Sequence, residues 1–198
     1  MNSFCASLSN GVREVLCSSS RSLLIKKGAA FSVQNIENEA FIFRAGVAAT
    51  VISEKEGKSL GIYLAEPGFV SNIMRISGTT NRHKADFNAG HYGYAFTDLR
   101  GCAVPLEVMR TLFRRDQQFA ELMFAHLADH YKDALTSMTL LSEASGEERI
   151  AWLLDEFDRV GVDAVGVTHE TIARLLGMNR VSVTRLMKSV LSSRYVRD

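Results

Sequence analysis

Between residues 23 and 97, hydrophobic positions occur in short runs that are separated by glycine and charged residues. Apolar runs cover 41–43, 47–52 and 60–64, and a charged turn at 54–58 separates the last two. Short apolar runs with turn signals at regular intervals are typical of a β-sandwich or barrel. Residues 77–94 interleave polar residues with glycine, and we expect an extended loop between strands there.

From Pro105 onwards the hydrophobic period becomes helical. Pro105 suits the first position of a helix, and Asp116 is a good N-cap for a longer one. Apolar residues then recur at steps of three and four over about three heptads, which predicts a dimer interface of the coiled-coil kind. One buried helix in a monomer would show the same pattern, so that alternative stays open. The predicted interface residues are Phe119, Met123, Leu127, Tyr131, Ala134, Met138 and Leu141.

A capping box marks the start of a further helix. Ser145 and Glu148 match the S-x-x-E pattern, in which each side chain binds the other residue's backbone N–H. The apolar face of this helix is Ile150, Leu153, Leu154 and Phe157, and 161–166 is a connector to the last segment. We therefore predict three parts, at 1–115, at 116–144 (the dimerisation helix) and at 145–198.

The segment 168–188 has the spacing of a helix-turn-helix. Such a motif needs a small residue, then a glycine at the turn, then a β-branched and an apolar residue in the second helix. Ala173, Gly177, Val183 and Leu186 occupy these positions in that order. Gly177 suits a turn that requires positive φ. This spacing predicts that the last two helices bind DNA.

The outward face of the second helix is polar and basic. Arg180 and Arg185 can each bridge O6 and N7 of a guanine, and Val181 can contact a thymine methyl. Short polar residues nearby suit phosphate contact or helix capping. A solvated basic face is the alternative interpretation. The predicted DNA-binding residues are Thr168, Thr171, Asn179, Arg180, Val181, Ser182, Thr184, Arg185 and Lys188.

Charge is unevenly distributed along the chain. The net charge is +1, but 167–198 carries six basic and two acidic residues, whereas 1–166 carries 17 basic and 20 acidic ones. This asymmetry is expected when one end meets phosphate. The 46% hydrophobic content is ordinary for a soluble protein. With no run of about 18 apolar residues and no signal-peptide core, we expect a cytoplasmic protein without a membrane span.

Several kinds of chemistry are not expected. Cys5, Cys17 and Cys102 are too few and too widely spaced for a disulfide framework, a closed zinc site or a cysteine-only iron–sulfur cluster. We find no nucleophile motif, no phosphate-binding glycine loop and no catalytic carboxylate pair, so an enzyme is not predicted.

One histidine pair has metal-binding spacing. His126 and His130 are four residues apart on a helix, which puts both on one face. The nearest further ligands are Asp129 and Asp133, and polar pairing along the helix is the simpler interpretation. No metal site is predicted.

The order of these features resembles the Crp/Fnr family of bacterial regulators, which are relatives of the cyclic-AMP receptor protein. The resemblance covers most of the chain: a glycine-punctuated β-region, the Thr97-Asp98 segment leading to Pro105, a long helix and a terminal helix-turn-helix. It implies an α+β fold with an N-terminal β-roll, a cyclic-nucleotide-binding-like jelly roll. It also implies a homodimeric transcription regulator that binds an inverted repeat of double-stranded DNA. A small effector in the β-roll and RNA polymerase are further implied partners.

The chain also departs from the family pattern. Val181 stands where the family usually has glutamate, so the preferred DNA sequence should differ. The Gly-Glu and Arg-Ser or Arg-Thr pairs that hold a cyclic nucleotide are absent after Gly68, so cyclic AMP is not predicted. Arg75 and Arg82 are the candidate anion partners of an effector, although neither stands in the sequence context of the family's arginine pair. The effector and any cofactor are therefore unknown.

The family's recognition helix is followed by a β-hairpin wing that rests on the DNA backbone. This chain stops at Asp198, seven residues after Leu191, which is too short for a complete wing. Fewer phosphate contacts would give weaker binding and a shallower salt dependence. A second function therefore stays open: a ligand-binding or protein-interaction module that uses the β-roll and has lost DNA binding.

Overall fold

Two antiparallel sheets form the N-terminal part of the protein in a computed structural model, which describes residues 3–32, 38–53, 59–77 and 90–194. One sheet has the order β1-β7-β3 and the other β2-β6-β4-β5. The predicted runs 41–43 and 60–64 lie in β3 and β5, and the run 47–52 overlaps β4, which begins one residue later. The strands are β1 Arg21–Ile25, β2 Ala30–Ser32, β3 Glu39–Ala45, β4 Ala48–Ser53, β5 Ser59–Ala65, β6 Gly90–Ala95 and β7 Leu99–Pro105.

Strand β3 shows why its sequence is continuously apolar. Phe41 and Phe43 pack between the sheets, whereas Ala40 and Ile42 contribute to a second core under the helices. Both faces of the strand are therefore covered, and a strand buried on both faces loses the polar alternation of an exposed sheet. The predicted turn at 54–58 and most of the predicted loop at 77–94 lie outside the described residues.

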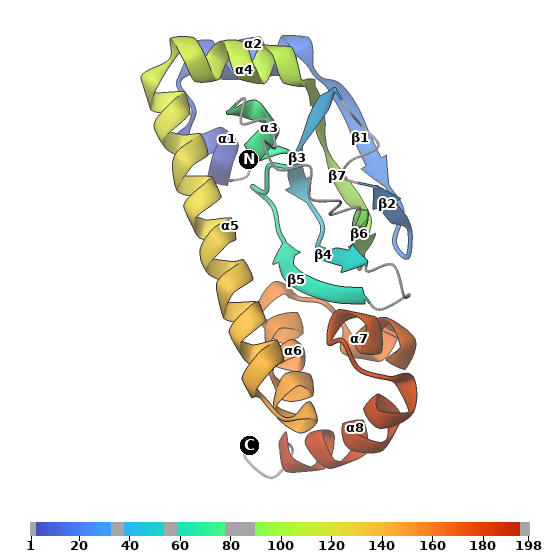
Figure 1. The fold of residues 1–198 in the computed structure, drawn as a ribbon. Helices are drawn as coiled ribbons and strands as arrows, with labels where there is room; N and C mark the ends of the chain where they lie inside the picture. Colours follow the sequence, from blue (N-terminus) through green and yellow to red (C-terminus); the bar gives the residue numbers. More distant parts are fainter. Residues whose placement is uncertain (1–2, 33–37, 54–58, 78–89, 195–198) are drawn as a thin grey trace.

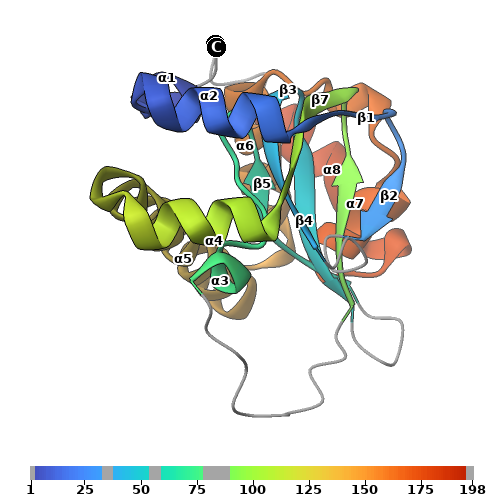
Figure 2. The same cartoon turned by 90° about the horizontal axis from the view of Figure 1, so that it is seen from above.

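The N-terminal helices α1 (Ser3–Ser7) and α2 (Asn10–Ser19) are elements that the sequence analysis did not predict. In α2, Val12 and Leu16 are four residues apart and both buried. They pack in one core with α4 (Leu106–Arg115), which lies at the same end of the roll as α2 in both views (Figures 1 and 2). Pro105 is the N-cap of α4 rather than its first residue.

The long helix α5 (Gln117–Glu143) runs along the molecule from α4 to the C-terminal helices (Figure 1). It begins where the sequence predicts, because the Asp116 carboxylate accepts a hydrogen bond from the Phe119 N–H at 2.8 Å. It ends at Glu143, and its C-cap Ala144 directly precedes Ser145, the N-cap of the next helix. The short helix α3 (Ile73–Ile76) packs near the start of α5, in the same hydrophobic core as α4.

The C-terminal helices are α6 (Gly146–Val160), α7 (His169–Leu175) and α8 (Arg180–Arg194), with a short 3-10 turn at Ala164–Gly166. The predicted capping box is present: the Ser145 N–H donates to the Glu148 carboxylate at 2.8 Å, and the Glu148 N–H donates to the Ser145 hydroxyl at 3.3 Å. Helix α6 ends at Gly161, whose φ of 69° is left-handed. The proposed domain boundaries stay predictions, although helix caps lie at both.

The C-terminal helices pack directly on the four-stranded sheet. Ala49 and Val51 of β4 share one hydrophobic core with the buried faces of α6, α7 and α8. A Cβ atom at Gly61 of β5 would lie 3.0 Å from the Leu175 carbonyl oxygen of α7, so only glycine allows this approach without displacement. The predicted α+β arrangement is confirmed, with the last helices docked on the β-roll. None of the helices in the described ranges is long and apolar enough to cross a membrane.

Candidate nucleic-acid interface

Helix α7 begins at a cap that the sequence identified. The Thr168 hydroxyl accepts a hydrogen bond from the Thr171 N–H at 3.1 Å. Ile172 and Ala173 then turn inward and are buried in the core that α7 shares with α8. The small side chain of Ala173 suits the close crossing of the two helices.

The turn between the helices has the expected geometry. Gly177 has a φ of 60°, in the left-handed region that favours glycine. The Met178 N–H donates to the Ala173 carbonyl at 2.9 Å, which closes the end of α7. The Asn179 side chain accepts from the Ser182 N–H at 2.8 Å and so caps α8. Two of the predicted DNA contacts, Thr168 and Asn179, therefore also have local structural roles.

Helix α8 is apolar inside and basic outside. Val183, Met187 and Val190 are buried against α6 and α7. On the opposite face Arg180, Arg185 and Lys188 are all exposed, and Val181 is 77% exposed. Within the described part of the chain, none of these three cations takes part in a salt bridge. Their charged groups are available to an anionic partner.

Thr184 has a role that the sequence analysis missed. Its hydroxyl donates to the Arg180 carbonyl at 3.0 Å and lies 3.0 Å from Nδ1 of His169 at the start of α7. Thr184 therefore links the two helices. His169 was not among the predicted DNA-binding residues. The sequence signal that could have identified it is a polar ring in the first position of the first helix of the helix-turn-helix.

The predicted dimer stripe on α5 divides between two environments. Phe119 and Met123 are buried in the chain's own core, with α1, α2 and α4. Leu127, Ala134 and Leu141 are half-buried. Tyr131 and Met138 of the predicted set are 65% and 59% exposed. Together with Phe124 (70% exposed) and Leu135 (45%), which were not in that set, they form an exposed stripe. Burial within the chain removes the first two predicted residues from a surface that a second copy can reach.

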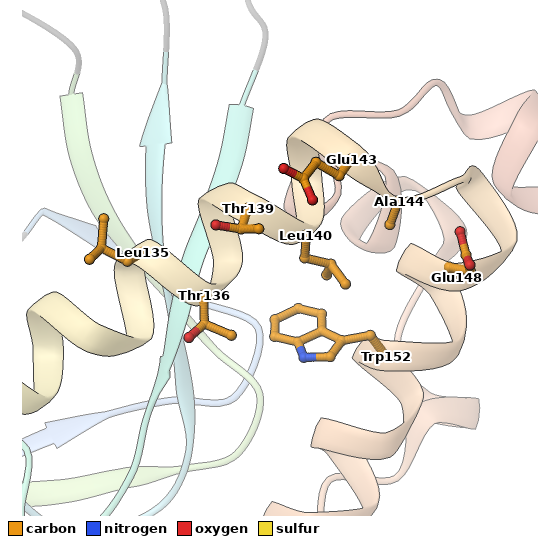
Figure 3. A pocket seen from close by; sticks show the side chains of 8 residues that line it. All are labelled: Leu135, Thr136, Thr139, Leu140, Glu143, Ala144, Glu148 and Trp152. Carbon is orange, nitrogen blue, oxygen red and sulfur yellow. The ribbon is translucent and has the colours of Figure 1, made fainter.

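A groove of about 700 Å³ lies where α5 meets α6 (Figure 3). Leu135 belongs both to the groove and to the exposed stripe, and the indole of Trp152 on α6 forms the facing wall. Glu143 and Glu148 add two carboxylates. The apolar surface of α5 thus continues onto the first helix of the C-terminal segment. The remaining lining residues are Thr136, Thr139, Leu140 and Ala144.

The histidine pair on α5 is part of the packing between α5 and the β-roll. The His130 ring stacks on Tyr63 of β5, with centroids 5.3 Å apart, and on Phe69, with centroids 4.9 Å apart. Burial, with a smaller contribution from His126, lowers the pKa of His130 to about 4, so this ring is neutral at pH 7. In the described residues no group of three or more histidine, cysteine or acidic side chains could hold a metal ion.

The two arginines suggested for an effector are not both described. Arg75 is exposed at the end of α3, where its carbonyl accepts a hydrogen bond from the Arg110 side chain at 3.0 Å. Arg82 lies outside the described residues. Their joint role stays a prediction.

Comparison with known proteins gives similarity in structure alone. No family model matches the sequence, and no curated protein does. A protein from Eubacterium rectale assigned to the Crp/Fnr family of transcriptional regulators has a TM-score of 0.76 and 19% identity, covering 96% of this chain and 87% of that one. The c-di-GMP-responsive global regulator CLP of Xanthomonas campestris has a TM-score of 0.70 and 13% identity, covering 93% of each chain.

A third solved structure, a Crp/Fnr-family transcriptional regulator from Thermus thermophilus, has a TM-score of 0.65 and 19% identity over 87% of both chains. In each case the likeness includes both the sheet region and the terminal helices, since most of both chains is covered. The order of roll, long helix and terminal helices is the order that the sequence predicted. The chain has the fold of the Crp/Fnr transcriptional regulators.

Proposed function

We propose that this protein is a homodimeric, sequence-specific DNA-binding regulator of transcription of the Crp/Fnr type, acting in the cytoplasm. The observation that carries the proposal is the outer face of α8. Arg180, Arg185 and Lys188 lie there on the exposed side of a helix-turn-helix, and among the residues that the structure describes none of the three has a salt-bridge partner. The shared fold supports the same conclusion, because its solved representatives include transcription regulators.

In this proposal α8 enters the major groove. The guanidinium groups of Arg180 and Arg185 each bind O6 and N7 of a guanine, and Val181 contacts a thymine methyl. Lys188, two turns after Val181, binds phosphate and adds affinity without sequence preference. The net charge of +4 over 167–198 favours approach to DNA over the mildly acidic remainder of the chain.

Dimerisation uses the exposed stripe of α5. Phe124, Tyr131 and Met138 are spaced seven residues apart, as one position of successive heptads, and Leu135 lies on the same side. A two-fold axis beside this helix would relate two copies of α8. Recognition helices in such dimers lie about 34 Å apart, in successive major grooves, so the DNA site is an inverted repeat.

Effector control acts through the contact between the β-roll and the C-terminal helices. The core shared by β4, α6 and α7 and the 2.7 Å salt bridge between Arg159 of α6 and Glu66 couple the two parts. A small molecule that binds the β-roll better in one arrangement than in another would shift the direction of α8. RNA polymerase is the partner through which such a regulator would act.

The proposal is tested by selecting bound sequences from a pool of random duplexes. We expect enrichment of an inverted repeat whose half-sites are about 10 base pairs apart. The Arg180→Ala and Arg185→Ala variants should each lose preference at one base pair of each half-site, at a cost of about 1–3 kcal/mol. Failure of the wild-type protein to enrich any sequence, with and without added metabolites, would favour a ligand-binding or interaction module instead.

A further inference from the structure

The groove between α5 and α6 has the size and the lining of a small-molecule site. Its volume of about 700 Å³ lies within the range of roughly 300–1,000 Å³ that is usual for ligand pockets. Leu135 and Leu140 of α5 and Trp152 of α6 give it apolar walls. Figure 3 shows the side chains of Thr136 and Leu140 pointing toward the indole. The groove lies outside the β-roll, where the long helix meets the first helix of the C-terminal segment.

Trp152 is a fixed wall of this groove. Its side chain packs against the hydrophobic core that α6 shares with β4, α7 and α8. It also borders a small apolar pocket beside Gly61 and Leu175, on the side of the β-roll. These contacts hold the indole in place, so the part of it that borders the groove loses little conformational freedom when a ligand covers it.

The charged groups in the groove are both acidic. Glu143 and Glu148 are exposed, and the eight lining residues, all in the described part of the chain, include no lysine, arginine or histidine. Hydrogen bonding with Ser145 lowers the pKa of Glu148, so this carboxylate stays ionised well below pH 7. Arg149, next to Glu148 in the sequence, donates instead to two backbone carbonyls, at 3.0 and 3.5 Å. The groove therefore disfavours anions and favours a cation.

An indole beside carboxylates is suited to an organic cation in particular. The face of tryptophan attracts cations more strongly than that of any other aromatic side chain. An apolar ligand body can cover Leu135 and Leu140, while its charge lies near Glu143 and Glu148. A hydrated metal ion would gain nothing from the leucines, and a neutral apolar molecule would gain nothing from the carboxylates. We propose that this groove binds an organic cation with an apolar body, such as a quaternary ammonium or phosphonium ion.

Such a ligand would also favour one arrangement of the two helices. It contacts α5 through Leu135 and Leu140 and α6 through Trp152, so it binds best where these walls lie as close as they do here. Its effect on the direction of α8, and so on DNA, rests on the proposed function. The binding site itself does not depend on that function.

The test uses the full chain and two probes that have the same shape and opposite charge, tetraphenylphosphonium and tetraphenylborate. Trp152 is the one tryptophan of the chain, so tryptophan fluorescence reports directly on this groove. We expect a saturable change in fluorescence with tetraphenylphosphonium and none with tetraphenylborate at the same concentrations. Isothermal titration calorimetry gives the Kd independently and also serves variants that lack the indole.

Substitutions separate the groove from the rest of the surface. Glu148→Gln removes the charge but keeps the capping box, and it should raise the Kd of tetraphenylphosphonium about threefold, the effect of one exposed ion pair. Adding Glu143→Gln should bring the increase to about tenfold. Glu147→Gln is the matched control, because it removes the same charge from the same turn of α6 outside the lining, and its Kd should equal that of the wild type.

Trp152→Leu tests the indole. The loss of a cation–π contact should raise the Kd about tenfold in calorimetry. Circular dichroism compares the folding of all variants, and the glutamine variants decide the question if Trp152→Leu lowers the midpoint of thermal unfolding.

The outcomes are distinct. Equal Kd values for the wild type and the double glutamine variant would overturn the inference, and so would equal binding of the two probes. An apparent Kd that rises with protein concentration would overturn it as well, because a second copy of the chain would then occupy the groove. None of these results touches the regulator proposal. Binding of the cation with the expected series of variants, by a protein that binds no duplex, would support the inference and reject the proposed function.

Discussion

Replacing Phe124 with alanine removes the most exposed large apolar side chain of α5. The ring is 70% exposed in the single chain, so its loss should leave the fold of each protomer unchanged. The substitution should weaken only the dimer, in which a second copy of the chain would cover the Phe124 ring. This variant therefore separates the proposed dimer surface from the internal core, where Phe119 is buried.

The size of the effect follows from area. A phenylalanine buries roughly 150–250 Å² in a core, so a ring with 70% exposure has roughly 140 Å² left to bury in a dimer. At about 25 cal/mol per Å², and with burial between half and complete, the variant loses about 1.8–3.5 kcal/mol per protomer. Symmetry doubles this, which predicts a dimer dissociation constant roughly 300 to 10⁵ times higher.

Sedimentation equilibrium over a range of protein concentrations measures the constant. Met138→Ala should act in the same direction, and Met74→Ala is its matched control, because the two side chains are 59% and 55% exposed on different helices. Binding of an inverted repeat should weaken together with dimerisation. If Phe124→Ala and Met74→Ala dimerise equally well, α5 does not pair through this face and the reasoning fails.

Three further predictions test other parts of the structure. Lys188→Ala should weaken binding to all duplexes alike and reduce the slope of log Kobs against log salt by about one for each copy bound. Arg180→Ala should instead change the base preference. Salt titrations on selected and scrambled duplexes distinguish the two variants. Gly61→Val should force α7 from β5 and destabilise the protein by about 1–3 kcal/mol in urea denaturation, and an unchanged midpoint would contradict the close packing. His130 has a pKa lowered to about 4, so the unfolded state binds the extra proton first and stability falls as pH drops below about 6.5. Between about pH 7 and pH 5 the free energy of unfolding of the wild type should fall by about 2 kcal/mol more than that of His130→Phe. Equal decreases in the two proteins would contradict the burial of the His130 ring.

Local features of this protein could be predicted from sequence alone. The Ser145–Glu148 capping box, the Asp116 cap and the left-handed Gly177 all depend on contacts within about four residues, so the residues that determine them are adjacent in the chain. The inner face of α8 was correct for the same reason, because helical spacing alone puts Val183, Met187 and Val190 on one side.

Features that depend on distant contacts could not be predicted in this way. Helices α1 and α2 were missed, because their few apolar residues become meaningful only once α4 and the sheet lie beneath them. The helical period of α5 was recognised, but a period does not say what covers each face. Phe119 and Met123 face the chain's own core, whereas Phe124 remains outside.

The sequence by itself determined where helices α5 to α8 start, where the chain turns between α7 and α8 and which side of α8 is apolar. Tertiary structure alone decided what those sides meet: α7 against Gly61 of the roll, and His169 against Thr184, 15 residues away. The physical reason is that backbone geometry and capping are settled among neighbours in the chain, whereas burial and hydrogen-bond partners across helices depend on the whole chain's packing, which no local pattern encodes.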